Sequence, residues 1–383
     1  NLRIQEVSFQ ALHWRGSDIT PLRPCDYYYD DQTLEIPINA EMQDDLEKVS
    51  QINQEEDYET RRLATFTIKY ETSLNHNMQG CYLSTYDYNG EEQRLITTQF
   101  ESHYAREAFP CIDEPAAKAK FSLTLLVPDY TEKDVVLTNT PLLAKDCNRF
   151  TFQTTPSIST YLLAWVIGPL QSISMVNKNG VKVSSYCALN QPVESLLFAN
   201  STAARALEYY DERFQEKYPL PKLDQVALPD FEAGAMENWG LVTYRESMML
   251  ADKTATLETK QSIALTVTHE LSHQWFGDLV TMQWWDDLWL NESFASVIEY
   301  YATAALYPEF NIWQDFFTGY CFAALRRDCL PGVQAVHQPV DHPAEIATLF
   351  DSAIVYAKGA HLIFMLIRLM GEEKFNQGIC DYF

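Results

Sequence analysis

The sequence predicts an α+β protein of two domains, with an N-terminal antiparallel β domain at residues 1–187 and an α-rich domain at residues 188–383. Two observations indicate this fold class. Apolar residues alternate with a period of two up to about Cys187 and then recur at helical spacing. A chain of 383 residues is also long for a single hydrophobic core. Because the chain starts at Asn1 and ends within a helical pattern, we expect it to be a piece of a longer protein.

The strands of the β domain are predicted from period-two segments that are separated by Pro, Asn, Asp and Gly. These predicted strands are 65–70, 121–127, 149–155, 160–167 and 181–186. The run 41–59 is rich in Glu, Asp and Gln, and we expect a solvated loop or a polar edge there.

Helical periodicity dominates the second half of the chain. It predicts helices at 194–217, at 259–276 and between Asp287 and Pro308, with a short strand at 223–228. Pro219 and Gly277 stand just beyond the first two helices, where helices commonly end. The third helix carries Glu292 in its first turns, where the helix dipole favours a carboxylate.

The composition limits the partners and the location of the protein. A formal net charge of −25 argues against nucleic acid or an anionic membrane surface as a partner, since both repel acidic surfaces. No window approaches the uninterrupted apolar length of a membrane span, and no basic-then-apolar leader opens the chain. The eight cysteines are scattered without a CxxC pair, which indicates a reducing compartment. We therefore expect a soluble, cytoplasmic protein.

A candidate zinc site lies in the second predicted helix. His269 and His273 are four residues apart and share one helix face, so both imidazoles can bind one ion. Glu270 is free to hold a water, and Glu292 offers a third ligand from the next helix. Three protein ligands leave one position open, which is typical of a catalytic zinc site. The alternative is a pair of core histidines beside a surface salt bridge.

A second candidate segment has small residues around a polar centre. Its residues are Gly234, Ala235, Met236, Glu237, Asn238, Trp239 and Gly240. Such a segment allows the backbone to approach a bound ligand closely. On composition alone, an ordinary loop with a solvated glutamate explains it as well.

These motifs occur together with others, and the whole set resembles the aminopeptidase N family of gluzincin zinc aminopeptidases. The further motifs are Trp275-Phe276-Gly277-Asp278, Phe109-Pro110-Cys111-Ile112-Asp113-Glu114-Pro115, the run from Trp284 to Glu292, and Val355-Tyr356-Ala357-Lys358-Gly359. Within the family, the chain is similar to the broad-specificity bacterial cytoplasmic enzymes, often called lysyl aminopeptidases. The resemblance covers nearly the whole chain.

The resemblance implies a saddle-like β domain that lacks its start and a thermolysin-like zinc catalytic domain, with the family's C-terminal helical domain absent. It also implies one zinc ion per chain and a role for each matching residue. The zinc ligands are His269, His273 and Glu292; Glu270 is the general base; Tyr356 binds the oxyanion; and Glu101, Gly234, Ala235, Met236, Glu237 and Asn238 bind the substrate. Glu237 and Glu101 together hold its free α-ammonium.

The function expected from this resemblance is a zinc metallo-aminopeptidase that acts on peptides with a free N-terminus. The alternatives are an epoxide hydrolase of the leukotriene type, a thermolysin-like endopeptidase, or a non-catalytic scaffold. The epoxide hydrolases usually have a second glycine where this chain has Ala235. Glu101 could instead form a surface salt bridge, and Tyr356 could simply pack in a helix. The oligomeric state and the preferred N-terminal residue are not indicated by the sequence.

The histidine ligands of a zinc ion usually donate their second ring N–H to a carboxylate or a carbonyl. Three acidic residues near the predicted ligands are candidates for this role, and the sequence does not choose between them. They are Asp278, Asp286 and Asp287.

Overall fold

The computed structural model describes residues 2–11, 23–29, 33–52 and 64–383, and these divide into two compact units. The first unit comprises Asn1–Leu74 and Arg106–Cys111, and the second comprises Asn75–Ala105 and Ile112–Phe383. The domain boundary predicted between residues 187 and 188 falls inside the second unit and stays a prediction.

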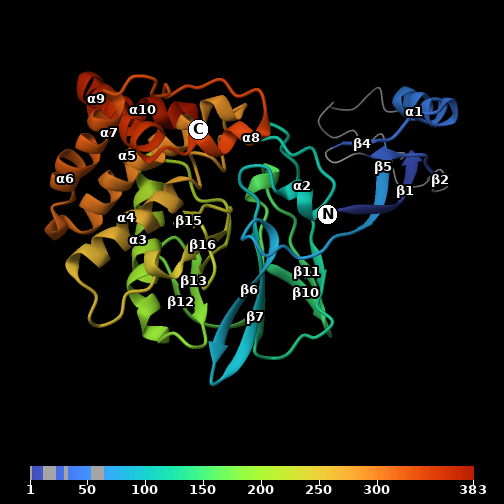
Figure 1. Ribbon diagram of the computed structural model, residues 1–383, viewed down its shortest axis with the longest axis horizontal. Coiled ribbons are helices and arrows are strands. Elements are labelled where there is room, and N and C mark those ends of the chain that lie inside the picture. Colours follow the sequence, from blue (N-terminus) through green and yellow to red (C-terminus); the bar gives the residue numbers. More distant parts are fainter. Residues whose placement is uncertain (1, 12–22, 30–32, 53–63) are drawn as a thin grey trace. The chain divides into compact units, whose positions relative to one another are not determined.

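In its described part, the first unit contains a small antiparallel sheet with helix α1 packed on it (Figure 1). Its elements are β1 (Arg3–Ala11), β2 (Arg23–Pro24), β3 (Tyr28–Tyr29), β4 (Leu34–Glu35), α1 (Ala40–Ile52) and β5 (Ala64–Glu71). The main sheet has the order β2-β1-β5, and β3 pairs with β4. Phe9 of β1 and Met42 of α1 are buried in one cluster, so the helix packs on this sheet.

The loop predicted for 41–59 is wrong for its described part, because residues 40–52 form α1. Met42 and Leu46 are four residues apart and share one helix face, which packs against Phe9. Asn39 Oδ1 accepts the backbone N–H of Met42 at 2.9 Å and satisfies a free donor of the first turn. A narrow apolar stripe was thus enough for a helix in a strongly polar run. The rest of the run, from residue 53, lies outside the described residues.

The second unit is built on an eight-stranded sheet. Its strands are β6 (Gly80–Tyr88), β7 (Glu91–Gln99), β9 (Asp134–Thr138), β12 (Trp165–Val176), β13 (Lys182–Ala188), β14 (Lys222–Leu228), β15 (Ala235–Met236) and β16 (Leu241–Arg245). They run in the order β15-β16-β14-β13-β12-β7-β6, with β9 also paired to β12. The pairings β13–β14 and β14–β16 are parallel and the others are antiparallel. A separate antiparallel sheet contains β8 (Thr124–Leu126), β10 (Leu142–Asp146) and β11 (Arg149–Phe152).

The strand predicted at 160–167 is wrong in its first half. Thr160–Leu162 form a 3-10 helix, and β12 begins only at Trp165. The Asn139 side chain takes the place of a neighbouring strand in hydrogen bonding to this backbone. Its Nδ2 donates to Leu162 O at 2.7 Å, and its Oδ1 accepts the N–H of Ala164 at 2.8 Å. The other predicted strands lie at β5, β8, β11, β13 and β14, with β8 and β11 shorter than expected.

Helices fill the remainder of the second unit (Figure 1). The α-helices are α3 (Leu197–Phe214), α4 (Leu257–Ser272), α5 (Trp289–Leu306), α6 (Ile312–Asp315), α7 (Cys321–Asp328), α8 (Pro343–Ile346), α9 (Gly359–Met370) and α10 (Glu372–Tyr382), while α2 (Ala105–Ala108) lies at the division between the units. A π-helix, η9 (Ser352–Lys358), runs directly into α9. The three predicted helices therefore exist as α3, α4 and α5, and the α+β fold class is confirmed.

Buried contacts hold α4 and α5 side by side. Thr268 of α4 and Thr303 of α5 are joined by a 2.9 Å hydroxyl hydrogen bond. Just beyond α4, the ring of Phe276 stacks on Phe294 of α5 at a centroid distance of 4.9 Å. Because α4 and α5 carry the candidate ligands, these contacts fix the spacing of the candidate metal site.

Among the described residues, one helix is long and apolar enough to cross a membrane by length and composition alone. Residues 352–370, which form η9 and α9, make a 19-residue helix with a mean hydropathy of 1.5. Of this apolar window 39% is buried, and it includes Ile354, Ile363 and Ile367. Length and composition alone do not distinguish a membrane span from a core helix of a globular protein.

Candidate metal centre

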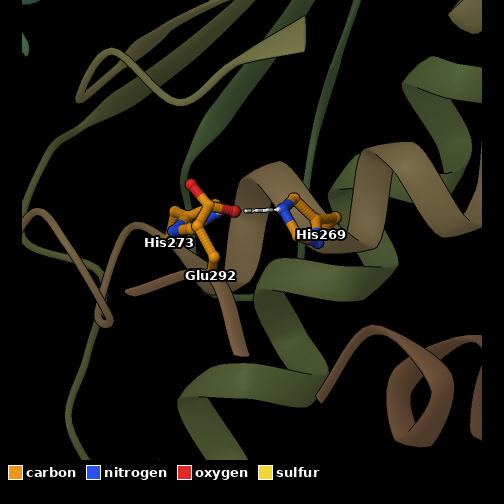
Figure 2. A group of neighbouring side chains, drawn as sticks. All are labelled: His269, His273 and Glu292. Atoms are coloured by element: carbon orange, nitrogen blue, oxygen red, sulfur yellow. Dashed lines mark hydrogen bonds and ion pairs between the residues drawn. The ribbon is translucent and has the colours of Figure 1, made fainter. Parts of the chain in front are cut away.

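The two histidines and the glutamate of the predicted zinc site converge (Figure 2). His269 Nε2 lies 3.0 Å from His273 Nε2 and 3.2 Å from Glu292 Oε2. His273 Nε2 lies 3.4 Å from the same carboxylate oxygen. His269 lies in the last turn of α4, His273 caps that helix, and Glu292 lies in the first turn of α5. All three ligand atoms come within 4.8 Å of one another.

Each imidazole is oriented by a contact of its second nitrogen. His269 Nδ1 lies 2.6 Å from Glu299 Oε2, and His273 Nδ1 lies 2.8 Å from the carbonyl oxygen of Phe276. Both partners are acceptors, so each Nδ1 carries the hydrogen and donates it. The two Nε2 atoms are left to face Glu292 Oε2, at 3.2 Å from His269 and 3.4 Å from His273.

This donor set fits a small divalent cation. Ligand atoms about 2.1 Å from a tetrahedral ion lie about 3.4 Å apart, close to the three separations found here. Two imidazole lone pairs at 3.0 Å repel each other unless a cation or a proton lies between them. Two histidines and one carboxylate are a ligand set that suits zinc.

Burial and mutual charge perturb the titration of all three groups. Burial alone would lower the pKa of His273, but the carboxylates of Glu237 and Glu292 outweigh it and raise that pKa to about 9. For Glu292, burial acts to raise the pKa, but His273 and His269 outweigh it and lower the pKa to about 2. The site is thus a strongly anionic place for cations to bind.

Glu270 directly follows His269 in α4, and its side chain is buried. Burial raises the pKa of its carboxyl to about 8; His269 opposes this rise, and Glu237 adds to it. A cation at the ligands would lower this pKa from that value. A carboxylate tuned toward neutral pH suits proton transfer in both directions.

Glu237 and Glu101 form a second acidic group beside the ligands. Oxygen atoms of Glu101, Glu237 and Glu292 come within 4.8 Å of one another. The Oε1 atoms of Glu101 and Glu237 are buried and have no hydrogen-bond partner among the described residues. Burial raises the pKa of both carboxyls, and the charge of Glu237 raises that of Glu101 further. The alternative of a surface salt bridge for Glu101 therefore does not fit its Oε1 atom.

The segment containing Glu237 is held along the edge of the sheet. Ala235 and Met236 form β15 against β16, and Gly234 O accepts the N–H of Arg245 at 2.9 Å. The Asn238 side chain donates to Thr243 Oγ1 at 3.3 Å. A Cβ on Gly234 would meet nothing within 4 Å, so no neighbour in the fold requires a glycine there.

Tyr356 approaches the ligands from the π-helix η9. Its ring is inclined by 29° to that of His269, with 6.1 Å between the centroids. Ser293 Oγ of α5 donates to Val355 O at 2.5 Å, and a Cβ on Gly359 would overlap Ser293. Gly359 thus allows η9 to pack directly on α5. π-helical turns inside helices are frequent at functional sites.

The acidic partners predicted for the histidines are wrong, because Glu299 and the carbonyl of Phe276 take those places. Asp287 instead accepts from Trp289 and lies 2.9 Å from His337 Nδ1. The main-chain carbonyl of Asp286 accepts the N–H of Gln338. Asp278 is buried, and its main-chain carbonyl accepts from Lys118 Nζ. Sequence reasoning missed Glu299, although it lies about two helical turns beyond Glu292 on the same face.

Two family models match most of the chain. The Peptidase M1 N-terminal domain matches residues 22–162, and the Peptidase family M1 domain matches residues 198–383. The chain belongs to peptidase family M1. Membership in this metallopeptidase family implies a metal ion, and the group of His269, His273 and Glu292 offers it a site.

Curated relatives of this M1 chain are aminopeptidases. It is 51% identical over 325 residues to aminopeptidase N of Lactococcus lactis subsp. lactis, and 47% identical over 322 residues to aminopeptidase N of Lactobacillus helveticus. These matches cover 83% and 84% of the chain, and 38% of each relative. Endoplasmic reticulum aminopeptidase 1 of Rattus norvegicus is 43% identical over 325 residues, which are 83% of the chain and 34% of the relative. The M1 chain thus spans little more than a third of the length of these relatives.

Proposed function

We propose that this chain carries the catalytic site of a zinc metallo-aminopeptidase, which removes the N-terminal residue from peptides. The observation that carries the proposal is the adjacency of two groups. A cation site of His269, His273 and Glu292 lies beside Glu101 and Glu237, whose Oε1 atoms are buried and accept no hydrogen bond within the described part of the chain. The names of the relatives agree with this function.

The carboxylate pair explains the choice of substrate. Buried carboxylates without a partner are unfavourable, and a cation that joins them removes much of that cost. The α-ammonium of a peptide is such a cation. Glu237 and Glu101 bind it, and a blocked amino terminus leaves them unpaired. The backbone of Gly234, Ala235, Met236 and Asn238 lies along the substrate.

The reaction is hydrolysis of the first peptide bond. A bound zinc ion supplies Lewis-acid chemistry, because it polarises the scissile carbonyl and lowers the pKa of a water from about 15.7 to about 7. Glu270 takes the proton of the attacking water and returns it to the leaving amine. The Tyr356 hydroxyl donates a hydrogen bond to the developing oxyanion.

The alternative functions are less well supported. An endopeptidase or an epoxide hydrolase gives no reason for two buried carboxylate oxygens that accept no hydrogen bond from the described residues beside the ligands. A non-catalytic scaffold gives no reason for a complete ligand set with a buried glutamate, Glu270, between the histidines.

The proposal is tested with aminoacyl chromogenic substrates, each with a free or an N-acetylated amino group. The zinc-loaded chain should cleave only the free forms, and Glu270→Ala should abolish cleavage with zinc still bound. Glu237→Ala should raise KM strongly for the free forms. Equal cleavage of both forms, or no cleavage by the zinc-loaded chain, contradicts the proposal.

We also propose a cytoplasmic location. All eight cysteines are free thiols, which agrees with a reducing compartment. Fractionation of the source cells tests this, and recovery with secreted proteins contradicts it.

A further inference from the structure

We infer that Gln274 is a positioning residue, which sets the distance between the metal ligands and the carboxylate that binds the substrate ammonium. This inference rests on the proposed function. Gln274 directly follows the ligand His273 and is 1% exposed.

Every polar group of the Gln274 amide is used. Its Nε2 donates to Glu237 O at 3.0 Å and to Glu270 O at 3.2 Å. Its Oε1 accepts the backbone N–H of Gly240 at 3.2 Å. The Gln274 side chain thus joins the C-terminal end of α4 to the main chain of Glu237 and to that of Gly240, which ends the segment 234–240.

The rest of this segment is anchored on either side of Glu237. Before it, β15 pairs with β16. After it, Trp239 O accepts from Asn139 Nδ2 at 2.9 Å, and Gly240 O accepts from the buried Lys222 Nζ at 2.7 Å. A Cβ on Gly240, where φ is +80°, would overlap Asn139 O, so this end lies against the backbone that directly follows β9. Gln274 provides the contact between these anchors and α4.

The reaction gives this contact its importance. The α-nitrogen and the scissile carbonyl carbon of a substrate are joined through a single Cα atom, so the distance between these two atoms is fixed. The ammonium site must therefore lie at a matching distance from the metal ligands. A displacement of about 1 Å in such a site can reduce the rate by roughly a hundredfold. Gln274 is the short covalent and hydrogen-bonded route between the two groups.

The test uses two hydroxamate ligands that differ only in the amine. Leucine hydroxamate offers both the metal-binding group and the α-ammonium, and 4-methylpentanohydroxamate offers the metal-binding group alone. Their Kd values are measured by calorimetry on the zinc-loaded chain. Gln274→Met keeps the side-chain length and removes all three hydrogen bonds. We expect it to weaken leucine hydroxamate by roughly tenfold and to leave the amine-free ligand unchanged.

A matched control is Gln171→Met. Gln171 lies on β12, and its Nε2 also donates to two carbonyl oxygens, Ala188 O at 3.1 Å and Gln191 O at 2.5 Å. Its partners include none of the candidate site residues. This variant should lose a comparable amount of stability, with both ligands bound as in the unmodified chain.

A double-mutant cycle separates a positioning role from a structural one. In the Glu237→Ala background, Gln274→Met should have no further effect on leucine hydroxamate, because the two residues act through one carboxylate. An equal loss in both backgrounds, or equal weakening of the two ligands, overturns the inference. If Gln274→Met does not retain zinc, Gln274→Glu is measured instead, because it keeps the acceptor for Gly240 and removes the amide donor to Glu237 O. It should also weaken leucine hydroxamate and leave the amine-free ligand unchanged. An unmodified chain that binds both ligands equally contradicts the proposed function itself.

Discussion

Glu299 Oε2 lies 2.6 Å from His269 Nδ1, about two turns along α5 from the candidate ligand Glu292. One helix therefore supplies both a direct ligand and the acceptor that orients another ligand. The carboxylate holds the hydrogen on Nδ1, leaves Nε2 free to bind a metal, and increases the basicity of the ring.

Removing that carboxylate should weaken metal binding. We expect Glu299→Gln to lower zinc affinity by about 10- to 100-fold, because the ring loses its charged acceptor. The measurement is a competition with a chromophoric chelator. Asp287→Asn is the control, because Asp287 contacts Trp289 and His337 and neither ligand histidine. Equal affinities for both variants would contradict the orienting role.

Zinc binding should release protons at neutral pH. The pKa of His273 is raised to about 9, so below that pH its imidazole is mostly protonated without a metal and must lose a proton to bind one. Apparent zinc affinity should therefore rise from about pH 6 to about pH 9 and then level off. Calorimetry in buffers of different ionisation enthalpy measures the released protons directly. An affinity that is constant over this range would be inconsistent with the carboxylate-rich site.

Removing the Tyr356 hydroxyl should affect catalysis and not folding. The ring lies 6.1 Å from that of His269, and Tyr356→Phe keeps this packing. Loss of one oxyanion donor typically lowers kcat by about 10²- to 10³-fold. We expect that loss with unchanged zinc content and Tm. An unchanged kcat would assign Tyr356 to packing alone.

The sequence predicted the parts of the site that depend on local spacing. The ligands on α4 follow from two histidines separated by one helical turn, and Glu292 follows from its position in the next helix. The role of Glu101 came from the family resemblance, because nothing local to it indicates a contact with Glu237. Glu299 and Gln274 were missed for another reason. Each acts through a contact whose partner is set by packing between elements.

The errors in the fold have similar causes. Helix α1 was missed because two apolar residues, Met42 and Leu46, are a weak signal until Phe9 is known to lie beneath them. The start of β12 was predicted too early because the apolar run 161–164 is typical of a buried strand. Asn139, which is distant in sequence, binds its backbone instead. Tertiary contacts overrode local propensity in both places.

The packing of Gly359 on α5 gives a further prediction. A Cβ at this position would overlap Ser293, and both the side chain and the helix backbone have little room to move. We expect Gly359→Ala to destabilise the protein by about 1–3 kcal/mol, as overpacked cores do. Because Tyr356 lies one turn earlier on the same helix, kcat should fall as well. Chemical denaturation and steady-state kinetics measure the two effects.

A compensating change should identify the clash as the cause. Ser293→Gly removes the overlapping atoms but costs about 1 kcal/mol as a glycine within a helix. It also removes the hydroxyl that donates to Val355 O. In the double variant, the alanine methyl occupies the space left by Ser293, so its stability should exceed the value expected from adding the two single losses. Simple additivity would mean that Gly359 matters for its backbone and not for its contact with α5, and the position of Tyr356 would then need another support.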